Sequence, residues 1–150
     1  MDCNVSIGKQ NFADIRENKY FYIDKTAFIK EWWDSGDDVT LITRPRRFGK
    51  TLNMSMLNCF FSNQYAGRGD LFEGLKIWEY EKYRNIQGTY PVIFLSFAGI
   101  KSDNINDAKL QIKGLIATVY GLHRYMLEGN FLSANEKAMF ERMTMFMEDA

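Results

Sequence analysis

The sequence predicts an α/β fold in which helices cover a parallel β-sheet. Two short apolar segments, residues 39–43 and 91–97, have the length and the β-branched or continuous apolar character of buried strands. A helix-length segment, residues 50–61, lies between them, and strands joined by a helical crossover run parallel. A basic loop, residues 44–49, leads from the first strand directly into this helix. These observations favour the α/β class.

Helical segments are expected ahead of the first strand. Residues 11–17 form a short helix, and the aromatic residues 20–23 continue in an extended conformation. Asp24 caps a second helix over residues 25–33, in which apolar side chains recur every three or four positions. These side chains are Phe28, Ile29, Trp32 and Trp33. We interpret the two tryptophans as packing residues rather than as a stacking platform for adenine.

The second half of the chain is mostly helical in this prediction. The helix over residues 50–61 has an apolar inner face of Leu52, Met56, Cys59 and Phe60. A long helix follows the second strand and reaches about residue 127. Ser133 and Glu136 have the spacing of a capping box, which begins a last helix.

Two strands make a poor sheet, and the sequence ends on a helix. We therefore expect residues 1–150 to be one domain that is the incomplete N-terminal part of a larger one. Its parts are an N-terminal segment (residues 1–36), a strand–loop–helix–strand core (residues 37–100) and a helical segment (residues 101–150).

Composition excludes several kinds of protein. Lys and Arg number 19, as do Asp and Glu, so no overall charge attracts nucleic acid or an anionic membrane. One histidine and two separated cysteines make a zinc site implausible. No apolar run approaches the length of about 20 residues that a membrane span needs. We expect a cytoplasmic protein without a membrane partner; its oligomeric state is open.

The loop after the first strand carries the chemistry. The phosphate-binding pattern is G-x-x-x-x-G-K-[ST], and the chain reads R-P-R-R-F-G-K-T, with only the first glycine replaced. Gly49 lets the backbone approach phosphates, Lys50 reaches the β- and γ-phosphates, and the Thr51 hydroxyl binds Mg²⁺. The following helix directs its positive end at the anion. The predicted nucleotide-binding residues are Arg44, Pro45, Arg46, Arg47, Phe48, Gly49, Lys50, Thr51 and Leu52.

Catalytic residues remain unassigned by the sequence. Hydrolysis needs an acidic residue at the end of a second strand, but residues 91–97 end without one. Arg46 and Arg47 are either solvated charges or contacts to the triphosphate, to a neighbouring subunit's nucleotide or to nucleic acid. The alternative function is a non-enzymatic module whose basic loop binds nucleic acid or a protein partner.

Three segments carry a family resemblance: residues 22–26 (YIDKT), 44–51 (RPRRFGKT) and 90–97 (YPVIFLSF). They resemble the AAA-ATPase-like proteins of anaerobic and gut bacteria, in which an arginine at the position of Arg44 is typical. The resemblance implies a three-layer α/β/α P-loop NTPase that uses ATP and Mg²⁺. It also implies an acidic strand beyond this chain and often a C-terminal PD-(D/E)XK nuclease-like domain, through which nucleic acid is a possible partner. Phe12 and Tyr22 occupy the region where related NTPases hold the base.

Overall fold

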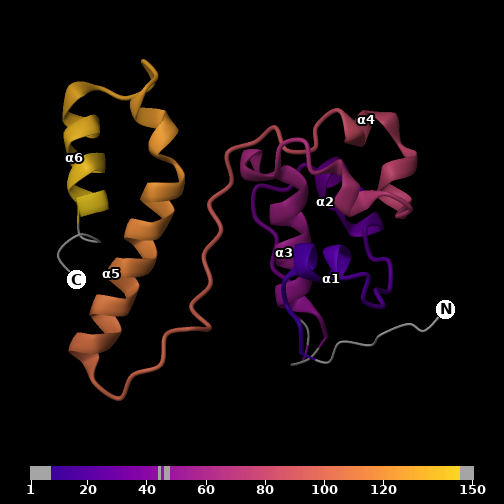
Figure 1. Ribbon diagram of the computed structural model, residues 1–150, viewed down its shortest axis with the longest axis horizontal. Coiled ribbons are helices and arrows are strands. Elements are labelled where there is room, and N and C mark those ends of the chain that lie inside the picture. Colours follow the sequence, from indigo (N-terminus) through magenta and orange to yellow (C-terminus); the bar gives the residue numbers. More distant parts are fainter. Residues whose placement is uncertain (1–7, 44, 46–47, 146–150) are drawn as a thin grey trace. The chain divides into compact units, whose positions relative to one another are not determined.

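The computed structural model describes residues 8–43, 45 and 48–145. The chain divides into two compact units, Met1–Val92 and Ile93–Ala150. Within the described residues, every regular element is a helix (Figure 1). The grouping of residues 1–150 into one domain stays a prediction.

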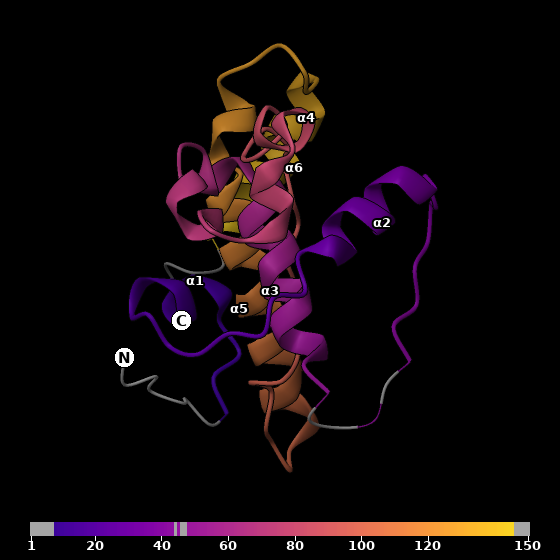
Figure 2. The same ribbon diagram turned by 90° about the vertical axis from the view of Figure 1, so that its right-hand side faces the viewer.

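The first unit is a cluster of short helices. Its α-helices and 3-10 helices are α1 (Phe12–Glu17), α2 (Ala27–Ser35), α3 (Lys50–Phe61), η1 (Asn63–Tyr65), η2 (Gly69–Phe72), η3 (Lys76–Glu79) and α4 (Glu81–Arg84). Helix α1 lies against α3 (Figure 2). The Phe12 amide donates to the Ser55 hydroxyl at 3.0 Å, which joins the start of α1 to the middle of α3.

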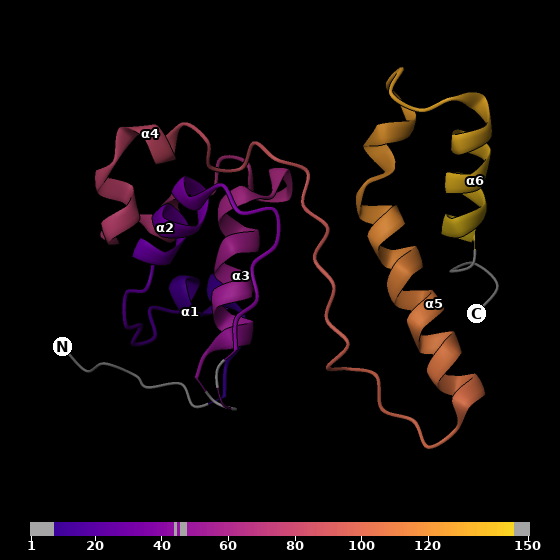
Figure 3. The ribbon, with the colours of Figure 1, turned by 180° about the vertical axis from the view of Figure 1, so that it is seen from behind.

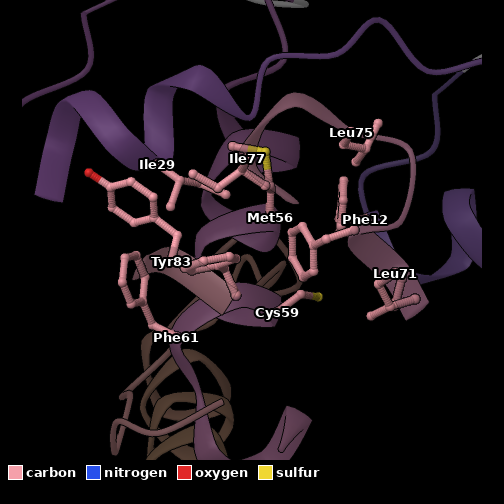
Figure 4. Close-up of a cluster of buried hydrophobic side chains, with 12 residues drawn as sticks. Phe12, Ile29, Met56, Cys59, Phe61, Leu71, Leu75, Ile77 and Tyr83 are labelled. Atoms are coloured by element: carbon pink, nitrogen blue, oxygen red, sulfur yellow. The ribbon is translucent and has the colours of Figure 1, made fainter. Parts of the chain in front are cut away.

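The core of this unit is rich in aromatic rings (Figure 4). Phe72 stacks on Phe12 at 5.1 Å between centroids and meets Phe60 edge-on at the same separation. The remaining buried members of the cluster are Ala13, Ile29, Met56, Cys59, Phe61, Leu71, Leu75, Ile77 and Tyr83. Because α3 supplies four of the twelve, its buried face is the centre of the unit.

Backbone hydrogen bonds fix the C-terminal end of α3. The Gly88 and Tyr90 amides donate to the carbonyls of Phe60 and Phe61, at 2.8 and 2.9 Å. Gly88 has a φ of +69°, and a Cβ there would lie 2.6 Å from the Ala66 Cα, so only glycine fits. Helix α3 is therefore held along its face and at its far end.

The second unit is a helical hairpin. Helices α5 (Ile105–Leu122) and α6 (Ala134–Met145) lie side by side, joined through η4 (Arg124–Leu127), as Figures 1 and 3 show. Tyr120 and Phe140 meet edge-on at 4.8 Å across the pair. No helix of the described residues is long and apolar enough to cross a membrane. The cytoplasmic location stays a prediction.

The predicted parallel-sheet α/β fold is wrong. Over the residues that the structure describes, neither 39–43 nor 91–97 forms a strand; the ladder contact present is an isolated parallel bridge between Ser62 and Tyr90. Val39 is 87%, Leu41 82% and Ile93 69% exposed, so these apolar side chains are not buried in a sheet. An apolar β-branched run favours an extended backbone, but a strand also needs a partner for its N–H and C=O groups.

Several helix predictions are confirmed. Helix α1 begins after Asn11, whose side chain accepts from the Asp14 amide, and α3 has the predicted bounds. The Ser133–Glu136 capping box is present, with the Glu136 carboxylate accepting from the Ser133 amide at 2.8 Å. The long helix α5 ends at Leu122, earlier than predicted, and a 3-10 helix follows it.

Candidate functional site

The N-terminus of α3 contains the glycine, lysine and threonine of the predicted phosphate motif. Gly49 caps the helix with φ +75° and ψ +19°, a left-handed conformation that glycine adopts without strain. Lys50 and Thr51 are the first two helical residues, and the Asn53 amide makes the first turn's bond to the Gly49 carbonyl at 2.9 Å. The first turn contains no acidic side chain, so the positive end of the helix is not neutralised from within the helix.

The structure covers only part of the predicted loop. Thr51 is exposed, and Lys50 and Leu52 are half-buried at the helix start, while Pro45 and Phe48 are exposed. Arg44, Arg46 and Arg47 lie outside the described residues. The structure thus brings the predicted residues 48–52 to one helix end, and their role in binding phosphate stays a prediction.

A hydrogen-bonded turn precedes α2. The Asp24 carboxylate accepts from the Thr26 amide at 2.8 Å, from the Thr26 hydroxyl at 2.6 Å and from the Lys76 amide at 2.8 Å. The Thr26 hydroxyl accepts in turn from the Ile77 amide at 3.1 Å. Asp24 is predicted to cap the helix, but Thr26 occupies the N-cap position, without a capping bond from its side chain, and Asp24 instead ties the turn to η3.

These bonds also set the ionisation of Asp24. Desolvation is the largest single influence and raises its pKa. The hydrogen bonds from the Thr26 side chain, the Lys76 amide and the Thr26 amide together outweigh it and hold the pKa below the ordinary value of 3.8. A carboxylate with a lowered pKa stabilises the fold above its unfolded-state pKa. That contribution is lost as pH falls through the folded-state value.

Asp24→Asn is expected to destabilise the chain by about 1 kcal/mol at neutral pH, because an amide nitrogen cannot accept the Lys76 bond. The difference between wild type and variant should shrink as the pH falls below about 4. Urea unfolding at a series of pH values measures both effects. A difference that is constant from neutral pH to pH ~2 would contradict this assignment.

Lys25, between Asp24 and Thr26, reaches the N-terminus of α3. Its Nζ lies 3.6 Å from the position that a Cβ on Gly49 would occupy. Lys25 is itself exposed. The structure therefore places a second lysine beside the Gly49-Lys50-Thr51 sequence.

The aromatic candidates for contact with a base belong to the core instead. Phe12 is fully buried, and the hydroxyl of Tyr22 donates to the Met56 sulfur at 3.2 Å, where burial raises the tyrosine pKa to about 12. Trp33 stacks on Phe61 at 5.2 Å, and Trp32 meets the same ring edge-on. The interpretation of the tryptophans as packing residues agrees with these contacts.

Other chemistry-bearing groups are scattered. No group of three or more His, Cys, Asp or Glu among the described residues is arranged to hold a metal ion. A pocket of about 160 Å³ lies between α2 and η3. None of its lining residues belongs to the predicted motif; they are Ala27, Lys30, Glu31, Lys76, Ile77 and Tyr80.

Comparison with known proteins gives a family. Residues 6–149 match the family described as predicted AAA-ATPase, AAA-ATPase-like. The chain is also 35% identical over 127 residues to an uncharacterised protein in the vnfD 5' region of Azotobacter chroococcum. That alignment covers 82% of this chain but 22% of the relative. No solved structure matches the chain. The family resemblance inferred from the three sequence segments is confirmed.

Proposed function

The chain belongs to the predicted AAA-ATPase family, and on that premise we propose that the N-terminus of α3 binds the phosphates of ATP together with Mg²⁺. The observation that carries the proposal is the left-handed Gly49 directly before a helix that begins with Lys50 and Thr51. A glycine followed by lysine and threonine at a helix start is the second half of the phosphate-binding pattern, and the family of the chain supports this assignment.

The donors at this helix end fit a polyphosphate. N–H groups of a helix's first turn lack intrahelical acceptors by geometry and are oriented outward, and the helix dipole favours an anion there. Lys50 adds a full positive charge at the first helical position. Its role is to bind and orient the phosphates.

In this proposal, Mg²⁺ enters the site bound to the nucleotide phosphates. The described residues hold no carboxylate cluster, whereas Mg²⁺ is commonly bound through one or two protein groups and substrate phosphates. Thr51 is exposed at the second helical position, and its hydroxyl is the proposed protein ligand. Bound Mg²⁺ would neutralise phosphate charge. Arg44, Pro45, Arg46, Arg47, Phe48 and Leu52 complete the proposed nucleotide-binding segment.

Thermal unfolding with and without Mg-ATP tests this function. A ligand at a hundred times its dissociation constant should stabilise the chain by about 2.7 kcal/mol, seen as a raised melting temperature. An unchanged melting temperature over a Mg-ATP series up to the millimolar range would refute the proposal. Binding to DNA that weakens steeply with salt, without any response to ATP, would favour the alternative module that binds nucleic acid through its basic loop.

A further inference from the structure

We infer that Lys25 is a second cationic ligand of the phosphates bound at the N-terminus of α3. The inference rests on the proposed function, and it concerns a residue outside the Arg44–Thr51 motif. It assigns a role to the lysine of the Asp24-Lys25-Thr26 sequence, which lies in a separate segment of the chain, 24 positions ahead of Gly49.

The Lys25 side chain lies at the N-terminus of α3. Its Nζ is 3.6 Å from the position that a Cβ of residue 49 would occupy. Because residue 49 is glycine, no side chain fills the space between its backbone and the Lys25 ammonium. A phosphate bound by the amides that follow Gly49 would therefore lie next to two lysines from separate parts of the chain, Lys25 and Lys50.

The turn around Lys25 is the second argument. Both oxygens of Asp24 are engaged by Thr26 and by the backbone of η3, and Thr26 is fully buried. The neighbours of Lys25 on both sides are thus fixed by hydrogen bonds, while Lys25 itself is exposed. Such an arrangement pre-organises the lysine backbone and reduces the entropy that binding would cost.

Charge is the third argument. Among the described residues, no carboxylate forms an ion pair with the Lys25 ammonium; Asp24, the nearest in sequence, uses its oxygens on the turn. Helix α3 has no acidic residue in its first turn. The Lys25 ammonium and the positive end of the α3 dipole therefore lie side by side. A polyphosphate is the ligand class whose charge complements both.

Calorimetric titration of the chain with Mg-ATP, and separately with inorganic tripolyphosphate, tests the role of Lys25. Lys25→Met keeps the length of the side chain and removes its charge. The variant should weaken the binding of both ligands about tenfold, near the lower end of the range for a hydrogen bond to a charged group. Lys25→Arg restores the charge and should bind within about threefold of wild type. The melting temperature of the free protein should be unchanged in Lys25→Met, since the side chain is exposed.

Lys76→Met is the matched control. Lys76 is also an exposed lysine of the first unit, and its backbone borders the same turn, but its side chain lies at the pocket between α2 and η3. The Lys76→Met variant loses the same charge as Lys25→Met. It should bind Mg-ATP and tripolyphosphate within about twofold of wild type, because salt screens long-range electrostatic effects.

The outcomes separate the two claims. If Lys50→Ala weakens Mg-ATP while Lys25→Met binds like wild type, the role of Lys25 is refuted and the proposed function stands. If Lys25→Met and Lys76→Met weaken binding equally, the effect is general electrostatics and the role of Lys25 is again refuted. If the wild type binds neither Mg-ATP nor tripolyphosphate, the proposed function fails and this inference fails with it.

Discussion

Lys50→Ala is expected to weaken the binding of Mg-ATP by about a hundredfold, which corresponds to about 2.7 kcal/mol for a charged contact to phosphate. Lys50 is the first residue of α3, directly after the left-handed Gly49, so its loss removes a full charge from the proposed phosphate site. The rise in melting temperature that Mg-ATP is expected to cause in wild type should be absent in this variant. Calorimetric titration and thermal unfolding of wild type and variant measure the two effects.

Lys76→Ala is the control for this variant, because it removes an exposed lysine of the same unit that lies outside the motif. It should keep wild-type affinity. The unfolding of both variants without ligand separates a loss of binding from a loss of structure. Equal affinity of Lys50→Ala and wild type for Mg-ATP would show that the helix start is not the phosphate site.

Phe72→Ala is expected to destabilise the first unit by about 3–5 kcal/mol. Phe72 is fully buried between Phe12 and Phe60, and its ring also stacks on Trp78 at 6.0 Å. Truncation leaves a cavity at the contact between η2, α1 and α3, and it removes aromatic pairs worth about 0.5–1.5 kcal/mol each. Urea unfolding followed by circular dichroism measures the shift, and a chain that is unfolded without denaturant also meets the expectation.

Two further variants bracket this result. Phe72→Leu keeps most of the apolar volume and should cost less than the alanine variant. Phe97→Ala truncates a ring that is 57% exposed and should change stability by less than about 0.5 kcal/mol. A midpoint for Phe72→Ala equal to that of wild type would contradict the assignment of this ring to the core.

Helices were predictable wherever a local signal defined them. Helix α3 has its predicted bounds because Gly49 starts it. Of its predicted inner face, Met56, Cys59 and Phe60 are fully buried, and Leu52 is half-buried. The helix after Ser133 was predictable because its capping box involves residues three positions apart. The glycine before α3 and the capping box before α6 each involve residues within one helical turn, so local sequence is enough to locate the start of each helix.

Whether residues 39–43 and 91–97 form strands could not be predicted from local sequence in the same way. Residues 39–43 and 91–97 are apolar, but strand formation depends on a partner segment that local sequence does not specify. In the structure, Trp32 donates to the Thr40 hydroxyl at 3.0 Å, and the backbone of Tyr90 bonds to Phe61 and Asn63. Thr40 of the first segment is therefore bonded to α2, and Tyr90, the residue before the second segment, is bonded to the end of α3 and to η1.

The position of the candidate site was predictable in part. The spacing of Gly49, Lys50 and Thr51 identified the helix start from the sequence alone, because the motif is contiguous. Lys25 was missed, since its approach to Gly49 depends on how the turn before α2 packs. The available signal was a lysine between Asp24 and Thr26, two residue types that hold turns by side-chain hydrogen bonds.

The central claim, that the start of α3 binds the phosphates of ATP, is tested most directly by locating the ligand. Backbone amide chemical shifts of the chain, recorded by NMR during titration with Mg-ATP, report which residues respond. The largest changes are predicted at Gly49, Lys50 and Thr51, with a saturable dependence on ligand concentration. Saturable changes confined to other residues, or no saturable change at all, would contradict the account.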